Sequence, residues 1–380
     1  MYSPKRSDLV SSFLLFTLLT MLSGCAPQDD RIKIGQFASI TGKEATFGIS
    51  CSNGVKMAID EANAAGGVLG KQIDLITLDD QTKAGEAATV VTKLINQEKV
   101  VAVLGEVASS RTLAAKPIAQ QNKIPLLTPA STNATVTEGA DYVFRICFID
   151  PFQGTAMAKF TATTLQKKKA AILKDVKSDY SIGLSEAFTK KFKELGGEIL
   201  EEQAFSSGDK DFKAQLTSIK AKNPEVIFLP AYYTEVALIA RQAKELGINV
   251  PIVGGDGWDS PVLIETAGDA LEGCYFSNHV SVNDTTPVVK NFVDKYKQLF
   301  GTVPDAMGVL GYDAGKIIVE AIKESKTGKP EDIRNALAGI KNFPGVTGSI
   351  TIDENRNANK PLVVLQIKGS GFVPVESVMP

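Results

Sequence analysis

Short apolar segments alternate with amphipathic segments of helical period from Ile32 to about residue 257. The segments "IKIGQFASI" and "QIDLITLDD" are rich in Ile and Leu, which favours strands. Between them, "NGVKMAIDEANAAGG" places Val55, Ile59 and Ala62 on one helix face, before two glycines that end the helix. A strand followed by a helix and another strand is typical of a mostly parallel sheet covered by helices. The alternation therefore predicts an α/β fold.

The alternation occurs in two series. The first continues with a predicted helix over 84–96, the strand "VVAVLG", a helix from about Ser110 and the strand "IPLLT". The second begins after "VFRICFID" and runs from the strand "KAAILKD" to the strand "VPIVGGD". The chain of 380 residues is long enough for two hydrophobic cores. We therefore predict two doubly wound, Rossmann-like lobes.

The rest of the chain is too short for a third domain. Helical segments over about 285–341 are followed by the predicted strands "GSITID" and "LVVLQIKG". We expect these elements to be added to the two lobes. The N-terminal lobe then comprises 32–150 plus 280–355, and the C-terminal lobe comprises 151–279 plus 356–380. This division makes the chain cross between the lobes more than once and predicts a multi-strand hinge.

The first residues have the pattern of an export signal. Lys5 and Arg6 precede the apolar run "LVSSFLLFTLLTML", which is shorter than the about 20 residues of a membrane-spanning helix. The following "LSGC" is similar to the lipobox of bacterial lipoproteins, which implies a signal peptide over 1–24, a lipid on Cys25 and a linker over 25–31. The alternative is an ordinary cysteine in an uncleaved anchor. We expect an exported protein, anchored by lipid and facing the periplasm or the cell exterior.

Three cysteines remain after Cys25, at Cys51, Cys147 and Cys274. An export compartment permits disulfides, but three cysteines cannot all pair with one another. The sequence does not choose among the three bridges that they allow, and all three thiols can equally be free and buried.

The charge of the chain disfavours a nucleic-acid partner. There are 41 Lys and Arg residues against 43 Asp and Glu residues, and the formal net charge is −2. A surface that follows phosphates needs an excess of basic residues on one face.

Hydroxyl side chains follow two predicted strands of the first series. Ligands of open α/β sheets bind beyond the carboxyl ends of the strands, near helix N-termini. Ser109 and Ser110 in "GEVASSRT" lie where a helix begins, so they are candidates either for holding a carboxylate or for capping the helix. In "TPASTN", Thr132 is a candidate for the ligand or for the turn, and Thr128 and Ser131 are assigned to the turn.

The strand ends of the second series contribute an acid and aromatic side chains. Asp256 lies among glycines without a basic neighbour in the sequence, so it suits either a cationic ligand group or an Asx turn. Tyr180, Tyr232 and Trp258 are candidates for an apolar wall with polar tips. One lobe thus offers hydroxyl groups that can donate to a ligand's carboxylate, and the other offers an acid that can accept from an ammonium group. This set is complementary to a zwitterion of amino-acid size.

Several segments in order are similar to the leucine/isoleucine/valine-binding family of periplasmic solute-binding proteins. These segments are "IKIGQFASITGKEATFG", "NGVKMAIDEANAAGGVLG", "DFKAQLTSIKAKNPEVIFL", "RQAKELGI" and "GYDAGKIIVEAI". The resemblance covers essentially the whole mature chain. It implies a type I periplasmic-binding-protein fold and a monomer that captures an amino acid or related zwitterion by hinge closure. It also implies delivery to the membrane-embedded permease of an ABC transporter, with no cofactor.

The resemblance also implies roles for individual residues. Ser109, Ala130 and Thr132 match the positions that hold the ligand's α-carboxylate and α-amino group, with Ala130 acting through its backbone. Tyr180 and Tyr232 match tyrosines that close over the ligand from the second lobe.

Other matched positions depart from the branched-chain pattern. Asp256 replaces the glutamate that pairs with the ammonium group, and Phe47 replaces a tryptophan beside the side-chain pocket. Lys83 and Ala108 occupy the positions of the disulfide found in branched-chain members, so that bridge is absent. These departures leave the choice of amino acid open, as do the neighbouring charges of Arg111, Arg145 and Glu106.

An enzyme on the same kind of sheet is the alternative from another class. "GVLGKQ" has the wrong spacing for a phosphate loop, and no G-x-G-x-x-G or G-x-S-x-G motif is present. The single histidine, His279, lacks a second histidine for a metal and is expected at the surface or at a strand end. Asp79 and Asp80 are expected to be solvated. We therefore predict no catalytic residue and no metal ligand.

A nearer alternative is a sensor with the same fold and site. Only its partner would differ, since closure would be reported to a signalling receptor instead of a transporter.

Overall fold

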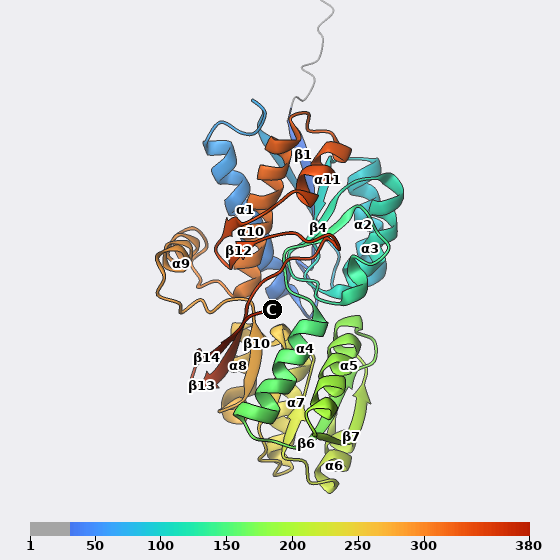
Figure 1. Ribbon diagram of the computed structural model, residues 1–380, viewed down its shortest axis with the longest axis vertical. Coiled ribbons are helices and arrows are strands. Elements are labelled where there is room, and N and C mark those ends of the chain that lie inside the picture. The colour runs from blue at the N-terminus through green and yellow to red at the C-terminus, as the bar shows by residue number, and fades with distance from the viewer. Residues whose placement is uncertain (1–30) are drawn as a thin grey trace, which may run out of the picture.

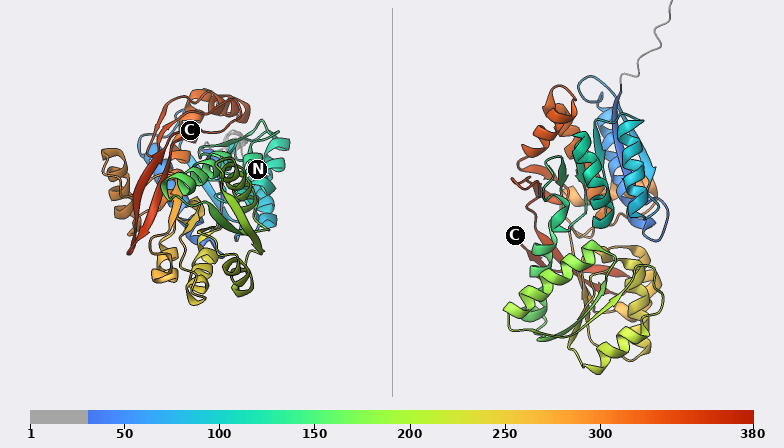
Figure 2. Two further views of the ribbon diagram at one scale, coloured as in Figure 1. Left: turned by 60° about the horizontal axis from the view of Figure 1, so that its bottom comes forward. Right: turned by 90° about the vertical axis from the view of Figure 1, so that its right-hand side faces the viewer.

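The computed structural model describes residues 31–380 and has the α/β fold that the alternation of segments predicted. The predicted signal peptide and the proposed lipidation site Cys25 lie outside the described residues. Two lobes follow one another along the longest axis of the molecule (Figure 1), and the two further views agree (Figure 2). None of the helices in residues 31–380 is long and apolar enough to cross a membrane.

The N-terminal lobe is built on a parallel sheet with the strand order β2-β1-β3-β4-β5. Its strands are β1 Ile32–Ala38, β2 Ile73–Asp79, β3 Ala102–Leu104, β4 Leu126–Thr128 and β5 Val143–Arg145. The intervening helices are α1 Ala45–Ala64, α2 Ala84–Asn96 and α3 Ser109–Asn122, and the short helix η1 Ala134–Val136 precedes β5. Strands β3 and β4 are buried throughout, as expected for parallel strands covered on both faces.

Later parts of the chain complete this lobe. They are α9 Pro287–Phe300, α10 Ala306–Ser325, α11 Pro330–Ala338, β11 Phe343–Gly345 and β12 Gly348–Ile350. Helix α10 packs along α1 with the backbones in contact, because a Cβ on Gly54 would lie only 2.0 Å from the carbonyl oxygen of Gly308. This contact brings Phe47 in the first turn of α1 close to Met307 in the first turn of α10.

The C-terminal lobe has a sheet with the strand order β14-β13-β10-β9-β8-β6-β7. Its strands are β6 Lys169–Asp175, β7 Glu198–Phe205, β8 Val226–Phe228, β9 Ile252–Gly254, β10 Tyr275–Asn278, β13 Leu362–Lys368 and β14 Gly371–Val378. Its helices are α4 Asp150–Lys159 with its continuation η2 Phe160–Thr164, α5 Asp179–Glu194, α6 Lys213–Ala221, α7 Tyr233–Glu245, η3 Asp256–Trp258, α8 Pro261–Ala267 and η4 Gly268–Leu271. Strands β13 and β14 are antiparallel to their neighbours, whereas the others pair in parallel.

Within residues 31–380 the chain passes between the lobes between β5 and α4, between β10 and α9, and between β12 and β13. The first and third of these connections begin side by side, since the amide of Arg145 donates to the carbonyl oxygen of Arg356 at 3.0 Å. Several connections therefore join the two lobes.

Cys51, Cys147 and Cys274 are buried, and their thiols are free. Burial raises the pKa of each thiol above its ordinary value. The sequence left open whether two of these cysteines form a disulfide, and the structure shows that none of the three does.

Candidate ligand-binding site

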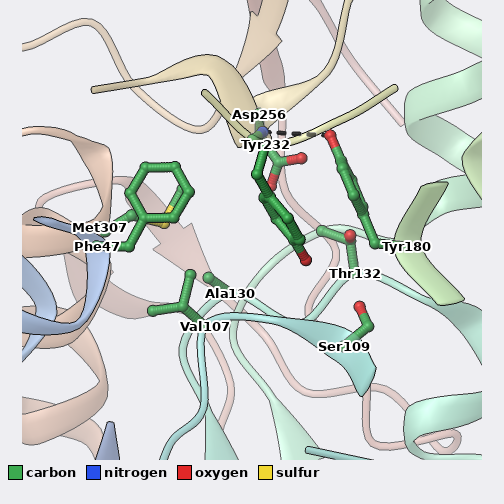
Figure 3. Close-up of a pocket in the computed structure, with 10 residues that line it drawn as sticks. Phe47, Val107, Ser109, Ala130, Thr132, Tyr180, Tyr232, Asp256 and Met307 are labelled. Atoms are coloured by element: carbon green, nitrogen blue, oxygen red, sulfur yellow. Dashed lines mark hydrogen bonds between the residues drawn. The ribbon is translucent and has the colours of Figure 1, made fainter. Parts of the chain in front are cut away.

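A small cavity, with about 10 Å³ of space open to the centres of water-sized molecules, lies where the two lobes meet (Figure 3). We call it the interlobe cavity, and it is lined by Phe47, Val107, Ser109, Ala130, Thr132, Tyr180, Tyr232, Asp256, Gly257 and Met307. The structure thus brings together in one place seven of the eight residues that the sequence proposed for the ligand. They come from strand ends and helix starts of both lobes, which is where open α/β sheets bind ligands.

Ser109 presents its hydroxyl to the interlobe cavity from the first residue of α3. Its oxygen accepts a hydrogen bond from the amide of Asn133 at 3.1 Å, so its hydrogen is left to donate to a ligand. The neighbouring Ser110 is used differently, because its oxygen accepts from the amide of Asp179 in the other lobe at 3.0 Å. The capping position of α3 is Ala108, so neither serine serves as its N-cap. Ser109 therefore lies at the positive end of α3 with a free donor.

The loop after β4 contains hydroxyls that hold the loop and one, on Thr132, that lines the interlobe cavity. Thr128 Oγ1 donates to the carbonyl oxygen of Glu106 at 2.6 Å, and Ser131 Oγ donates to the same oxygen at 2.9 Å. Both hydroxyls hold the loop, as the sequence assigned. The amide of Ala130 donates to Thr128 Oγ1 at 3.3 Å, which leaves its carbonyl oxygen to accept from a ligand. Thr132 lines the interlobe cavity between these groups.

Arg145 fixes this loop from behind. Its guanidinium donates to the carbonyl oxygens of Ser131 and Asn133, both at 2.8 Å, and to that of Ala134 at 3.2 Å. The side chain is fully buried by these contacts. Arg145 is thus a scaffold residue for the loop and does not line the interlobe cavity.

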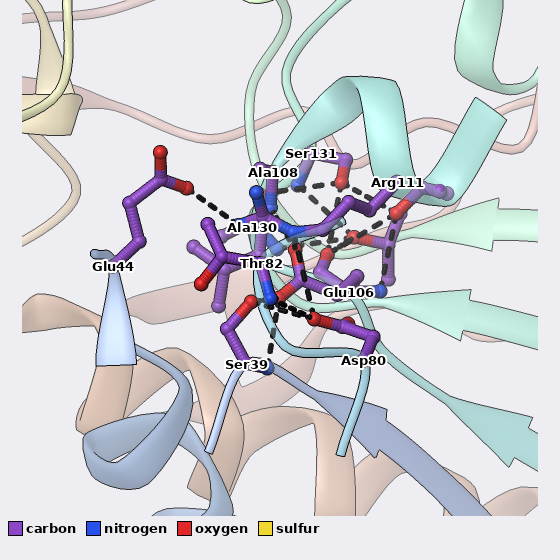
Figure 4. Close-up of polar contacts among 12 residues, drawn as sticks. Ser39, Glu44, Asp80, Thr82, Glu106, Ala108, Arg111, Ala130 and Ser131 are labelled. Carbon is purple, nitrogen blue, oxygen red and sulfur yellow. Dashed lines mark hydrogen bonds and ion pairs between the residues drawn. The ribbon is translucent and has the colours of Figure 1, made fainter. Parts of the chain in front are cut away.

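Arg111 is held by acids beneath the same site (Figure 4). Its guanidinium lies 2.7 Å from Glu44 Oε2 and 2.8 Å from Glu106 Oε2. Although burial acts to raise it, the pKa of Glu44 is lowered by Arg111 and Lys43. Because its donors are engaged with these carboxylates, Arg111 does not contribute a positive charge to the interlobe cavity.

Asp80 belongs to this buried group, which corrects the expectation that Asp79 and Asp80 are both solvated. Asp80 is fully buried and accepts from Ser39 Oγ at 2.7 Å. Burial and the nearby Glu106 raise the pKa of Asp80 to about 7. Asp79 is half-buried and accepts from the amides of Ile40 and Thr41. Both acids therefore act in the structure of the loops around them.

Two tyrosines form the wall of the interlobe cavity on the side of the C-terminal lobe. The rings of Tyr180 and Tyr232 are stacked with centroids 5.1 Å apart, and Phe47 meets Tyr232 edge-on at 6.2 Å. The hydroxyl oxygen of Tyr180 accepts from the amide of Gly257 at 3.2 Å. Burial and Asp256 raise the pKa of Tyr180, so its hydroxyl stays protonated.

Asp256 points its carboxylate into the interlobe cavity, but it is not unpaired as the sequence suggested. Oδ1 accepts from Gln153 Nε2 at 3.0 Å, and Oδ2 lies 2.9 Å from His279 Nε2. His279 does follow a strand, since it comes directly after β10, but it is buried and not at the surface. The sequence could not reveal this pair, because 23 residues separate its members.

Trp258 is the predicted ligand residue that the structure places elsewhere. Its ring is fully buried in the hydrophobic core of the C-terminal lobe, and Nε1 donates to the carbonyl oxygen of Leu229 at 3.0 Å. The indole packs so closely over β9 that a Cβ on Gly254 would lie 2.1 Å from it. Its position in sequence next to Gly257 was therefore no guide to the direction of its side chain.

Val107, Gly257 and Met307 line the interlobe cavity and were not proposed from the sequence. Val107 and Gly257 lie within strand-end segments that the sequence had already singled out. Met307 comes from α10, whose register against α1 only the folded structure defines.

The lobes are in contact around the interlobe cavity. Lys43 Nζ lies 2.8 Å from Glu235 Oε1, and the hydroxyl of Tyr233 donates to the carbonyl oxygen of Lys43 at 3.0 Å. On another side, Asn133 Nδ2 donates to the carbonyl oxygen of Asp179 at 2.7 Å. These contacts hold the two lobes together around the interlobe cavity.

Comparisons of the sequence and of the structure with known proteins match this chain to the same kind of protein, a periplasmic or amino-acid-binding protein. Residues 31–371 match a family model described as periplasmic binding protein. A leucine-, isoleucine-, valine-, threonine- and alanine-binding protein of Pseudomonas aeruginosa is 30% identical over 327 residues, which are 86% of this chain and 86% of that protein.

Two crystal structures have a similar fold over nearly their whole length. A leucine-binding protein from Thermotoga maritima has a TM-score of 0.88 and 42% identity, and the match covers 92% of this chain and 99% of that one. A branched-chain amino acid transporter substrate-binding protein from Streptococcus pneumoniae, in complex with isoleucine, has a TM-score of 0.87 and 34% identity, covering 92% and 100%.

Proposed function

The chain belongs to the periplasmic binding protein family, and from this premise we propose that it is an extracytoplasmic receptor for an amino acid or a related small zwitterion, which it delivers to an ABC transporter. The observation that carries the proposal is the composition of the interlobe cavity. Ser109 and Thr132 offer hydroxyl donors from one lobe, and Asp256 offers a carboxylate from the other. These groups are complementary to a carboxylate and an ammonium group on one small molecule.

Capture proceeds by closure of the two lobes. The ligand's carboxylate binds first to Ser109 and Thr132 beside the N-terminus of α3, and closure brings Tyr180 and Asp256 over it. A ligand drives closure only if it binds the closed arrangement more tightly than the open one, and contacts on both lobes supply that difference. We propose that the moving bodies are the lobes defined from the sequence, 32–150 plus 280–355 and 151–279 plus 356–380.

The binding energy required is within reach of these contacts. Micromolar capture needs about −8 kcal/mol. Hydrogen bonds to charged groups contribute about 1.5 to 3 kcal/mol each, so a handful of them suffices before the costs of ordering are subtracted.

The far end of the interlobe cavity favours an uncharged aliphatic side chain. Phe47, Val107 and Met307 line it with carbon and sulfur atoms. Arg111 and Arg145 are engaged with other groups and leave no cation there. The relatives named for leucine and isoleucine support the same ligand class.

The mature protein is held at the membrane by lipid on Cys25. The seven residues from Cys25 to Ile32 reach at most about 25 Å when fully extended, which keeps the lobes near the membrane surface. Labelling of cells with radioactive palmitate tests this part of the proposal. We expect label on the full-length chain and none on Cys25→Ser.

A thermal-shift screen of the purified protein tests the ligand class. We expect neutral aliphatic amino acids at millimolar concentration to raise Tm by several degrees, and charged amino acids to have little effect. Calorimetry with the best ligand then measures the affinity. Absence of stabilisation by any amino acid would contradict the proposed function.

A further inference from the structure

His279 is the only histidine in the 380 residues, and it lies directly behind the interlobe cavity. Its Nε2 is 2.9 Å from Oδ2 of Asp256, and its ring is stacked on Phe148 with centroids 3.9 Å apart and an interplanar angle of 19°. The side chain is completely buried, with an exposed fraction of 0%. The imidazole is therefore held in one orientation between an aromatic ring and the carboxylate.

Burial lowers the pKa of His279, although Asp256 acts to raise it, so the imidazole is neutral near neutral pH. A neutral imidazole has a single N–H group, and the contact with the Asp256 carboxylate places it on Nε2. Consistent with this tautomer, Nδ1 has no hydrogen-bond partner in residues 31–380. His279 thus donates to Asp256 without adding a positive charge.

Gln153 makes the second such contact, because its Nε2 donates to Oδ1 of Asp256 at 3.0 Å. Each carboxylate oxygen therefore has one neutral donor from the protein and a further lone pair for another donor. Two neutral donors stabilise an ionised carboxylate in a buried site while its negative charge stays uncompensated. A cationic group that enters from the cavity can form an ion pair with such a carboxylate.

Other titratable groups surround this pair on every side. They are Cys147 and Asp150 at the first connection and the start of α4, Tyr180, Tyr232, Asp259 and Lys360. Burial raises the pKa of Asp150 well above its ordinary value. Burial lowers the pKa of Lys360 to about 8, and its ammonium group contacts Thr347 instead of Asp256. Lys360 therefore does not act as the counter-ion of Asp256, and Asp150, being an acid, cannot.

We propose that His279 is a positioning residue that hydrogen-bonds the Asp256 carboxylate and aims it into the interlobe cavity, and that it thereby makes the site select molecules with an ammonium group over deaminated acids of the same shape. This inference rests on the proposed function. It differs from a packing role, because a packing role needs the ring of His279 but not its N–H group.

Two substitutions separate the roles. His279→Gln keeps an N–H donor for Asp256, whereas His279→Leu keeps an apolar side chain and removes the donor. Calorimetry measures Kd for L-leucine and for 4-methylpentanoate, which has the same shape without the ammonium group. Each variant is compared with the wild type at the same pH, from about pH 6 to about pH 8, so that other titrations in the protein cancel.

We expect His279→Gln to stay within about threefold of the wild type for leucine. In His279→Leu the Asp256 carboxylate loses one of its two donors and the contact that orients it, so leucine affinity falls roughly tenfold or more. The preference for leucine over 4-methylpentanoate falls with it. Equal losses for both molecules at every pH would mean a packing role and would overturn the inference.

Magnetic resonance of the imidazole provides a measurement that does not depend on the ligand. Since the chain has one histidine, ¹⁵N labelling of histidine yields a single pair of ring signals. We expect the neutral Nε2–H tautomer from about pH 7 to about pH 8. An imidazolium in that range, or the Nδ1–H tautomer, would disprove the inference. Failure of the wild type to bind either molecule or any amino acid would instead contradict the proposed function.

Discussion

Oδ2 of Asp259 in the C-terminal lobe accepts a hydrogen bond at 2.6 Å from the amide of Ala306, the first residue of α10 in the N-terminal lobe. The same helix is capped by Asp305, whose Oδ1 accepts from the amide of Gly308 at 3.0 Å and from Ser50 Oγ at 2.5 Å. Two buried carboxyl groups from different lobes thus share one helix N-terminus. Opening of the lobes would separate them.

This arrangement predicts that closure is favoured at lower pH. Burial and the nearby Asp259 raise the pKa of Asp305 to about 7. The stabilisation of the closed form is therefore present at low pH and is lost as the pH rises through about 7. We expect ligand affinity to be about threefold or more weaker at pH 8 than at pH 6, as measured by calorimetry.

Asp305→Asn keeps a capping side chain but cannot titrate, so it should flatten this dependence. Ligand affinity is the appropriate measurement, because the buried Asp80 also has a raised pKa and affects the pH dependence of unfolding within one lobe. An unchanged slope in Asp305→Asn would assign the dependence to another group.

Asp256→Asn tests the ammonium contact at constant shape. The substitution removes a buried charge that we assign to the ligand's ammonium group, so amino-acid affinity should fall roughly tenfold or more. The affinity for a deaminated acid should change much less. Calorimetric affinities that match the wild type would remove Asp256 from this role.

Lys43→Met tests the contact that links the lobes beside the interlobe cavity. Glu235 is almost completely buried, and loss of Lys43 Nζ, 2.8 Å away, leaves its charge less compensated in the closed form. We expect affinity to fall about threefold to tenfold, mainly through faster ligand release in stopped-flow experiments.

Lys56→Met is the matched control for this prediction. Lys56 pairs with Asp60 on the exposed face of α1, where each side chain is 59% exposed, and such pairs contribute little to stability. A slower or unaltered release rate in Lys43→Met would show that its ion pair does not hold the lobes together.

The parallel sheets explain why much of the site could be predicted. Loops that follow parallel strands meet at one edge of each sheet, so strand-end positions made Ser109, Thr132 and Tyr180 candidates, and the family resemblance implied their roles. Met307 could not be found in this way, because its place depends on the close packing of α10 against α1.

The direction of a side chain after a strand was less predictable than its position. Trp258 and Asp256 are both in η3, yet the indole packs into the core and the carboxylate faces the cavity. Asp256 and His279 belong to strand ends that are neighbours only because β9 and β10 pair in the folded sheet. Local sequence carries no signal for either distinction.

The buried free thiols of Cys51, Cys147 and Cys274 should be chemically inert in the folded protein. Their raised pKa values leave little thiolate, and burial excludes reagents. We expect no reaction with Ellman's reagent in the native state and complete reaction after unfolding in guanidinium. Peptide mass spectrometry identifies the modified residue, and fast native modification of any of the three would contradict the structure.

Met307→Ala should change which side chain the receptor prefers. Met307 closes the apolar end of the interlobe cavity together with Phe47 and Val107, so its truncation makes room for several more carbon atoms. One methylene in an apolar pocket is worth about 1 to 3 kcal/mol, so the ratio of phenylalanine to leucine affinity should rise roughly tenfold or more. Met57→Ala provides the control, because Met57 is buried in a separate core cluster, and its truncation should lower Tm without changing that ratio. If calorimetry shows the same ratio in both variants and the wild type, Met307 does not limit the size of the ligand.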